Sequence, residues 1–547
     1  MDLRSFFKID FLNSFVIFAI AVFSILIILY STKFMKGMAR LRGYYLWVII
    51  TGLAAMATAS ADNLIVLLVF WGFLGLSLYI LIGMGGDKAS PAAKKAFIIV
   101  GGSDALMILG IGLVYTLSGT FNISEIRLEL NNYLGITAFI CFAVAALAKA
   151  GLMPFHSWIP DCAEVAPIPV TAFLPASLDK LLGIYLLARL TLNLFVTTTA
   201  INIIIMLMGA FTIIAAVMMA LVQHDMKRLL GYHAVSQVGY MVLGIGTGNP
   251  IGIAGGMFHM LNNVIYKSCL FLTSGNVEYR MKTTELDKLG GLAKLMPITY
   301  ISCLIASLSI SGIPPFNGFA SKWMIYQGVI TQFSAASLAM RVTGVVCLLI
   351  AMFGSALTLA SFMKLIHATY LGQQKNNQSV REVSWTMWLP CVILAVFCVL
   401  FGVFAMQLPL RFLILPILGG VDFMGTWYSG LATGLILIAL GFGWLLIRII
   451  GSKQKVREDS MFAGGEFITT EENRVSGTEF YNTVKDYGLL PQIYKEAGAG
   501  DFDIYEQGKK LLFGASVKLR HLHNGVLPTY MVWCLLGAII LFLWCVR

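Results

Sequence analysis

Basic residues interrupt several long apolar runs of this sequence. Lys149, Lys180, His259, Lys267 and Lys322 each lie within or beside such a run. His259 and Lys267 are about two helical turns apart, so they lie on one face of a helix. A lysine at the centre of a bilayer costs roughly 2.5–3.5 kcal/mol, and such residues usually face a bundle interior or a wet cavity. One lysine would serve a structural purpose, so a set of four predicts a functional path.

The chemistry that suits these side chains is proton transfer. Removal from water makes it easier for a lysine to give up its proton, so a buried lysine can gain and lose one during turnover. A hydrated row of such groups would act as a relay for protons or another monovalent cation. The alternative for each lysine is a side chain that reaches the membrane surface or pairs structurally. We favour this alternative for the lysines near span ends, which are Lys94, Lys95, Lys227 and Lys364.

Two interior segments combine proline and glycine with these charges. Lys149 to Trp158 contains Pro154, and Ser311 to Lys322 contains two consecutive prolines. Proline removes a backbone donor and should break each helix, with the freed carbonyls facing protein or water rather than lipid. The relay interpretation is therefore favoured for Lys149 and Lys322. For His156, a hydrogen-bonded core histidine is an equal alternative.

The elements that must position these residues are membrane helices. Of 547 residues, 58% are hydrophobic and only 12% are charged, about half the charged share of ordinary globular proteins. The apolar runs are continuous, which excludes an outer-membrane barrel, and the first is a retained helix rather than a signal peptide. We expect an all-α polytopic membrane protein with about 14 transmembrane helices. The predicted spans are 11–31, 43–60, 63–83, 96–118, 134–153, 169–192, 201–222, 229–248, 250–275, 297–313, 340–370, 387–408, 428–450 and 526–546.

The spans group into an internal repeat. Residues 43–192 and 201–370 each hold five spans, so the second repeat starts on the opposite side of the membrane from the first. Corresponding helix breaks in inverted repeats are typical of transporters that bind ions near the bilayer midplane. The predicted organisation is an N-terminal helix and cytoplasmic loop (1–42), repeats 43–192 and 201–370, two additional membrane helices (371–450), a cytoplasmic-side amphipathic segment (451–525) and an anchoring helix (526–547).

The net charge of +11 reports orientation rather than nucleic-acid binding. Cations gather in alternate loops, which the positive-inside rule places in the cytoplasm, with both termini outside. The cations of these loops are Lys33, Lys36, Arg40, Arg42, Lys88, Lys94, Lys95, Lys227, Arg228, Arg280, Lys282, Lys288, Lys294, Arg448, Lys453, Lys455 and Arg457.

Other kinds of site are excluded by their missing motifs. The nine cysteines form no CxxC pair, which argues against a disulfide framework, a zinc site or an iron–sulfur cluster held by this chain. There is no Walker motif, no HExxH and no metal-ligand cluster, and Gly244, Gly246 and Gly248 close a membrane helix rather than a nucleotide-binding turn. No cofactor is therefore expected in this chain.

Residues 451–525 break the apolar pattern. Thr478 to His523 is predicted to be mostly helical, with an interruption at Gly498–Gly500 and a partly apolar face that includes Tyr487 and Tyr494. A helix lying along the membrane or a neighbouring subunit fits this pattern. A small cytoplasmic loop domain fits the periodicity equally well.

Several long motifs occur in order over roughly residues 10–410. They are Lys149 to Pro167, Gln223 to Tyr232, Ser236 to Tyr240, His259 to Lys267 and Gly312 to Lys322. With these motifs the sequence resembles the antiporter-like subunits of respiratory complex I, group 4 membrane-bound NiFe-hydrogenases and Mrp-type cation/proton antiporters. The tail from Phe480 resembles the lateral helix and terminal anchoring span of some members.

The resemblance implies roles for the buried charges. Lys149 matches the central lysine of the first broken helix, Lys180 the lysine of the next helix, and Lys322 the charged residue of the second broken helix. His259 and Lys267 match the bridging pair between them. Candidate modulators of this relay are Asp179, Asp104, His156, Lys227, Lys364 and His367.

The resemblance also implies partners. These are other antiporter-like and anchor subunits, the lipid bilayer and a peripheral cytoplasmic redox module, in a prokaryotic cytoplasmic (inner) membrane. Iron–sulfur clusters, NiFe or flavin are expected only in partner subunits. The expected ion is H+, with Na+ as the alternative, and no nucleic acid is expected as a partner.

Three departures from the family pattern stand out. Trp71-Gly72 replaces the usual Trp-Glu, so the glutamate that modulates the central lysine is missing. Asp179 or Asp104 is the candidate substitute, and we favour Asp179, beside Lys180, because it lies in an adjoining central helix. Asn263 stands where a histidine is common. The match begins at the third helix of the family pattern, so two N-terminal spans are missing, and either a neighbouring chain covers that face or the subunit is reduced.

The leading hypothesis is a proton- or sodium-translocating subunit of a multisubunit membrane oxidoreductase, of the hydrogenase or complex I-like kind. Redox energy from partner subunits would drive ion movement through the Lys/His relay. The alternatives are a subunit of an Mrp-type Na+/H+ antiporter and a degenerate scaffold that does not pump. The surface segment favours the first hypothesis, and Gly72 favours the scaffold.

Overall fold

The computed structural model describes residues 6–38, 40–372, 380–425, 428–451, 464 and 477–546. Lys453, Lys455 and Arg457, and most of the stretch 452–476 that begins the predicted amphipathic segment, lie outside the described residues. The described chain divides into a helical bundle within Met1–Tyr487 and a second unit, Gly488–Arg547.

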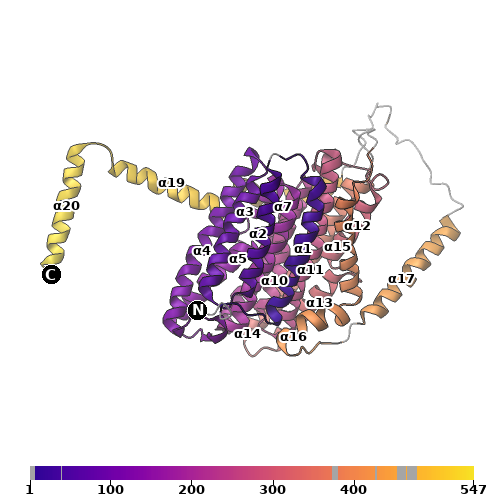
Figure 1. The fold of residues 1–547 in the computed structure, drawn as a ribbon, viewed down its shortest axis with the longest axis horizontal. Helices are drawn as coiled ribbons and strands as arrows, with labels where there is room; N and C mark the ends of the chain where they lie inside the picture. Colours follow the sequence, from indigo (N-terminus) through magenta and orange to yellow (C-terminus); the bar gives the residue numbers. More distant parts are fainter. Residues whose placement is uncertain are drawn as a thin grey trace. The chain divides into compact units, whose positions relative to one another are not determined.

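The first part of the bundle contains the helices of the first predicted repeat and the helix before them (Figure 1). Asn63, Asn132 and Thr198 cap the N-termini of α3, α5 and α9 by accepting backbone N–H bonds, as polar N-cap residues commonly do. The helices up to the repeat boundary are α1 (Phe11–Phe34), α2 (Leu41–Ser60), α3 (Leu64–Gly83), α4 (Ser90–Ser118), α5 (Tyr133–Ala150), α6 (Trp158–Val165), α7 (Ile168–Phe173) and α8 (Asp179–Arg189).

The second part of the bundle repeats the pattern of three helices followed by a broken one. Asp225 and Asn249 cap the N-termini of α10 and α11. The helices are α9 (Thr199–Leu221), α10 (Met226–Gly246), α11 (Pro250–Met281), α12 (Pro297–Ser311), α13 (Asn317–Ile330), α14 (Leu338–Ile366), α15 (Trp385–Val403), α16 (Leu415–Leu418) and α17 (Ser429–Leu446). A 3-10 helix, Gly477–Asp486, follows later in the chain.

The structure confirms a mostly α-helical membrane protein. Within the described residues, 11 helices are long and apolar enough to cross a membrane. Helices also occupy the predicted spans 229–248, 250–275 and 297–313, but they do not belong to this set. α10 and α11 carry many polar residues, and α12 has only 15 residues because it ends at a break. The count of about 14 spans therefore stays a prediction.

The most buried helices lie in the middle of the bundle. Residues 168–190 are buried without a gap, and α11 is buried from Ile251 to Val277. α10 packs against α9, α11, α6 and α13. Because these central helices face protein on all sides, their polar residues contact other side chains instead of lipid.

Strand structure is confined to one small pair in the described part of the chain. β1 (Leu128–Glu129) and β2 (Phe195–Val196) pair in parallel, with Leu128 opposite Phe195. The pair joins the loop before α5 to the loop before α9.

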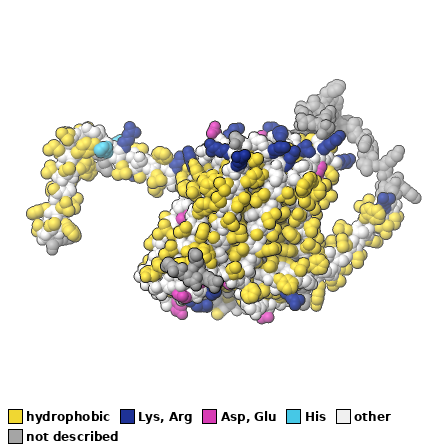
Figure 2. Space-filling model, viewed as in Figure 1, with side chains coloured by type: hydrophobic (Ala, Val, Ile, Leu, Met, Phe, Trp, Pro, Cys, Tyr) yellow, Lys and Arg dark blue, Asp and Glu magenta, His cyan; other side chains and the backbone are white. Residues whose placement is uncertain are grey.

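The surface of the bundle separates by charge. Figure 2 shows Lys and Arg side chains gathered along one rim, above a broad hydrophobic belt. This distribution agrees with a bundle that presents its basic loops at one face of a membrane.

The second unit contains α18 (Leu490–Gly498), α19 (Ile504–Leu522) and α20 (Leu527–Cys545). The predicted helix from Thr478 to His523 is thus three pieces, a 3-10 helix and two α-helices. The interruption between the α-helices covers 499–503 and overlaps the predicted Gly498–Gly500. α20 is long and apolar enough to cross a membrane.

Candidate functional site

The two broken helices end in the same way. α5 and α12 both stop at a glycine in the left-handed region, Gly151 with φ +79° and Gly312 with φ +80°. In both, the residue after the glycine donates its N–H to the carbonyl five residues earlier, at 3.0 Å and 3.1 Å. This double-bonded helix end is one that glycine favours, since it has no Cβ. The pattern Gly-x-x-Pro-Phe follows at both places.

Each broken end presents a carbonyl to a lysine. Lys180 of α8 donates to the Ala150 carbonyl oxygen at 2.9 Å, and Lys322 of α13 donates to the Ile310 carbonyl oxygen at 3.0 Å. The C-terminus of a helix carries partial negative charge, which favours a cation there. The structure therefore places two predicted lysines at the two half-helix ends.

Lys149 lies in the last turn of α5 and is fully buried. Its Nζ is 3.8 Å from Oδ1 of Asp179 and 4.6 Å from the ring centroid of Trp71. Asp179 is also buried, and it follows directly on the π-helical turn Leu174–Leu178. Lys149 is thus held between a carboxylate and the face of an indole ring, which attracts cations.

The approach of Asp179 to Lys149 depends on one glycine. A Cβ at Gly183 of α8 would lie 2.7 Å from the Ala146 carbonyl oxygen of α5. No side chain fits in this space, so glycine permits α5 and α8 to lie in backbone contact. That contact brings the carboxylate on α8 to the lysine on α5.

Asp104 reaches the same region from α4. Its Oδ1 accepts a bond of 2.9 Å from Nε1 of Trp71, and a Cβ at Gly72 would lie 4.0 Å from its Oδ2. A carboxylate therefore lies beside α3 at the level of Gly72, although α3 itself carries none there. Trp71 contacts Lys149 with its ring and Asp104 with its N–H.

The buried basic residues Lys149, Lys180, Lys267, His259 and Lys322, here called the row, continue along α11. Lys267 is buried and donates to the Leu230 carbonyl oxygen of α10 at 2.9 Å. Lys180 is near enough for its charge to act on Lys267. The hydroxyls of Ser177, in the π-helical turn before α8, and Ser268 of α11 are 2.7 Å apart. A polar connection thus joins this turn to α11.

His259 links α11 to the second broken helix. Its Nδ1 is 2.9 Å from the Ser321 hydroxyl, next to Lys322, and its Nε2 is 3.1 Å from Oε1 of Gln237. Asn263 lies one turn from His259 and one turn from Lys267, and is buried with no hydrogen-bond partner for either amide atom in the described structure. The amide therefore presents a donor and an acceptor between the two basic groups.

Lys322 has different surroundings from Lys149. Besides Ile310, its Nζ donates to the Ser355 hydroxyl of α14 at 3.0 Å and lies 4.5 Å from the ring centroid of Tyr240. None of the ion pairs found among the described residues involves it. A hydroxyl, a carbonyl and an aromatic face surround this charge.

The remaining predicted residues lie nearer the ends of the spans. Lys227 pairs with Glu278 at 3.0 Å, and Lys364 donates to two backbone carbonyls. His156 is partly exposed, and the ring of His367 lies 5.1 Å from that of Phe480. The structure does not bring these four residues into the row.

More than half of the chain, residues 61–351, matches the family model described as NADH:quinone oxidoreductase/Mrp antiporter, TM. The chain belongs to this family. The resemblance drawn from its motifs is thereby confirmed.

Two curated proteins of different kinds are similar to this chain. Hydrogenase-4 component B of Escherichia coli (strain K12) is 29% identical over 421 residues, covering 73% of this chain and 62% of that protein. Na(+)/H(+) antiporter subunit A1 of Staphylococcus haemolyticus is 32% identical over 407 residues, covering 69% of this chain and 50% of that protein. The chain spans less than two thirds of the length of either relative.

Two solved structures contain similar chains. One is the membrane-bound sulfane sulfur reductase, an archaeal respiratory membrane complex, with TM-score 0.79 and 25% identity over 99% of this chain and 89% of that chain. The other is the Mrp complex from Dietzia sp. DQ12-45-1b, with TM-score 0.68 and 21% identity over 74% of this chain and 82% of that chain. The latter likeness shows the fold alone.

Sequence reasoning missed one buried histidine of this family member. His233 on α10 is fully buried, and its Nε2 is 2.7 Å from the Ser361 hydroxyl. It directly follows the motif that ends at Tyr232. A histidine within the predicted span 229–248 was the available signal, by the argument that singled out His259.

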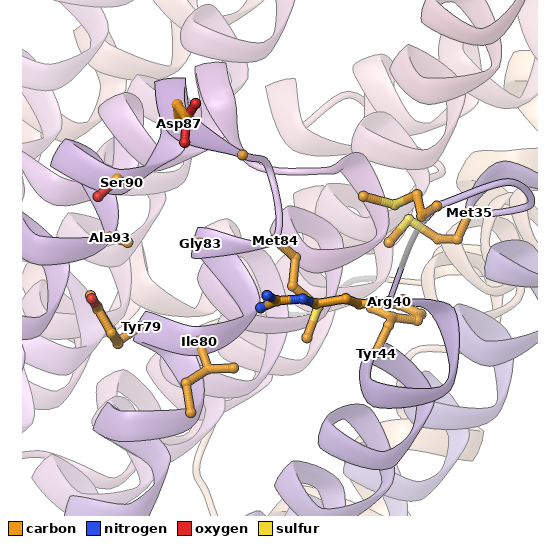
Figure 3. A pocket seen from close by; sticks show the side chains of 12 residues that line it. Met35, Arg40, Tyr44, Tyr79, Ile80, Gly83, Met84, Asp87, Ser90 and Ala93 are labelled. Atoms are coloured by element: carbon orange, nitrogen blue, oxygen red, sulfur yellow. The ribbon is translucent and has the colours of Figure 1, made fainter.

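The protein also has a cavity that lies away from the row. Its volume is about 620 Å³, and it lies between the loop after α1 and the start of α4. Figure 3 shows Arg40 alongside Met84, with Asp87 on the far side. None of the buried lysines described above lines this cavity.

Proposed function

We propose that this chain is a proton- or sodium-translocating, antiporter-like subunit of a multisubunit membrane-bound oxidoreductase. The observation that carries the proposal is the row of fully buried basic side chains that runs between two half-helix ends. Burying so many cations is costly, and basic residues at such positions usually mark an ion pathway or a proton relay. The family and the similar chain of an archaeal respiratory complex support the assignment.

In the proposed relay, Lys149 and Asp179 form the gate at one end. Their buried ion pair is stable only while both partners are charged, because removal of one charge leaves the other uncompensated. A change at Lys149 therefore alters the field at Lys180, the next residue after Asp179. Lys267 and His259 then pass the proton on toward Lys322 through hydrated contacts.

Two carboxylates can replace the glutamate that is missing from α3. Asp179 contacts Lys149 directly, and Asp104 acts on it through Trp71. Gly72 leaves α3 without an acid but open beside Asp104. The relay thus keeps a modulating carboxylate supplied from neighbouring helices.

The proposal includes partners and location. About 14 spans in two inverted repeats would lie in a prokaryotic cytoplasmic membrane, beside other membrane subunits. Iron–sulfur clusters, NiFe or flavin would belong to a peripheral redox module. Within the described residues, no group of three or more His, Cys, Asp or Glu side chains is placed to hold a metal.

An Mrp-type Na+/H+ antiporter subunit is the second candidate function. Its support is the likeness to antiporter subunit A1 of Staphylococcus haemolyticus. In that case the purified complex would contain no nickel, iron or flavin.

The test uses the complex purified through this chain and reconstituted into vesicles. Proton movement is followed with a pH-sensitive dye and sodium with a radioactive tracer, under redox drive or an imposed sodium gradient. Lys149→Ala and Lys322→Ala should abolish ion movement, whereas the exposed control Lys94→Ala should not. Normal ion movement by the two variants would instead favour a scaffold that does not pump.

A further inference from the structure

A second set of buried polar residues leaves the lysine row toward the membrane face that carries the basic loops. We propose that His233, Ser361 and Lys364 form a proton branch connecting Lys267 to that surface. This inference rests on the proposed function and adds the route by which protons reach the row. The side chains come from α10 and α14, the helices that also supply Tyr240 and Ser355 to Lys322, but the branch uses other residues of both helices.

The inner end of the branch is His233. Its ring lies 4.7 Å from that of Phe362, and Nζ of Lys267 lies 5.8 Å from the centroid of the same Phe362 ring. Nε2 of His233 is bonded to Ser361, while its Nδ1 is buried with no hydrogen-bond partner among the described residues. A histidine with one nitrogen bonded and the other open can accept a proton at one side and release it at the other.

The middle of the branch is one helical turn of α14. Ser361 and Lys364 are three residues apart, so they lie on the same face of the helix. Lys364 is fully buried, and its Nζ donates to the carbonyl oxygens of Leu221 at 2.7 Å and Gln223 at 2.6 Å. These carbonyls lie at the C-terminal end of α9, where partial negative charge favours a cation.

The outer end reaches polar surface residues. Gln223 precedes His224, whose Nδ1 is 2.8 Å from Oδ2 of Asp287, and both of these side chains are about two-fifths exposed. Asp287 and Glu479 are near enough for their charges to act on Lys364. A proton leaving Lys364 therefore meets carboxylates that face water.

The 3-10 helix Gly477–Asp486 covers this exit. Thr478 donates its hydroxyl hydrogen to Oδ1 of Asp287, and Phe480 packs against His367. Lys485 of the same segment also acts electrostatically on Lys364. The segment thus places both an acid and a base over the outer lysine.

The structural alternative is that Lys364 only caps α9. Lys364→Arg separates the two roles, because arginine keeps a charged donor for the two carbonyls but does not release its proton. In reconstituted complex, Lys364→Arg and His233→Gln should lower proton movement about a hundredfold while the complex assembles normally. Lys95→Arg, which keeps the ion pair with Asp161, is the matched control and should transport like the unchanged protein.

The outcomes are distinct from those for the proposed function. Normal transport by Lys364→Arg or by His233→Gln, alongside loss in Lys149→Ala, would overturn the branch and leave the relay intact. Normal transport by Lys149→Ala would overturn the proposed function itself. If Lys364→Arg fails to assemble, His233→Gln decides, since glutamine can still bond Ser361 but cannot carry the proton.

Discussion

Lys149 and Lys322 stand at two helix breaks with the same backbone geometry and very different charge. Lys149 has the carboxylate of Asp179 at 3.8 Å, whereas Lys322 is surrounded by a carbonyl, a hydroxyl and a tyrosine ring. Both nitrogens lie over an aromatic face, at 4.6 Å and 4.5 Å. The two breaks thus share a backbone geometry, but Lys149 precedes its break, Lys322 follows its own, and different groups balance the two charges. One end of the row is an ion pair, and the other is a cation held by dipoles.

The largest effect should come from removing the acid at the first break. Asp179→Asn leaves Lys149 buried without its counter-charge, which costs about 3–5 kcal/mol. We expect ion movement by the reconstituted complex to fall about a hundredfold, with reduced thermal stability. Asp161→Asn, which alters a partly exposed pair with Lys95, is the control. Unchanged coupling in Asp179→Asn would remove the ion pair from the mechanism.

A smaller effect on ion movement should follow from removing the second acid, Asp104. Asp104→Ala removes the carboxylate bonded to Trp71 and should slow ion movement about tenfold, or about 1.4 kcal/mol. Adding Gly72→Glu to this variant returns a carboxylate to α3 and should restore most of the rate. Transport assays on the single and double variants test this. Failure of Gly72→Glu to improve on Asp104→Ala would argue against equivalent roles.

At the second break, the expected effect is weaker still. Ser355→Ala removes a single hydroxyl from Lys322, and one hydrogen bond contributes about 1 kcal/mol. We expect ion movement to slow by about fivefold, measured as the initial rate in vesicles. A loss as large as that in Asp179→Asn would show that the two ends depend equally on their neighbours.

The smallest effect is expected at an ion pair outside the row. Arg189 donates to Asp10 at 2.6 Å. Burial alone would raise the pKa of Asp10, but the hydrogen bond and charge of Arg189 outweigh it and lower the pKa below its ordinary value of 3.8. Asp10→Asn keeps a side chain that can cap α1 and should cost about 1 kcal/mol of stability without changing transport.

The pH dependence of that cost follows from the sign of the shift. A lowered pKa stabilises the folded state above the ordinary value, and this contribution is lost as pH falls through the folded pKa. Thermal unfolding of the two proteins should therefore differ at neutral pH and converge in strong acid. A difference that persists below the folded pKa would contradict this assignment.

The lysines and the helix breaks were predictable because each is a local signal. A charge or a proline in an apolar run is costly wherever the chain folds, so its position can be found without knowing its neighbours. The surroundings were not predictable in the same way. Asp104 lies 32 residues after Gly72 in the sequence, and only the packing of α3 against α4 brings them together.

His233 is a buried residue that the sequence analysis did not identify. It lies in a helix whose polar residues face other helices, so the apolar pattern that exposed the lysines is weak there. Its partner Ser361 belongs to α14, far along the chain. Pairings between distant helices depend on close approaches such as the one at Gly183, which no local pattern encodes.

The paired helix ends also bear on how the protein would respond to voltage. In the proposed inverted arrangement, α5 and α12 cross the membrane in opposite directions, so their dipoles oppose each other along the membrane normal. A membrane potential of 100 mV does about 2.3 kcal/mol of work on one elementary charge that crosses it. Because the fixed dipoles cancel, the membrane potential would do this work on the moving ion and not on the helices that surround it.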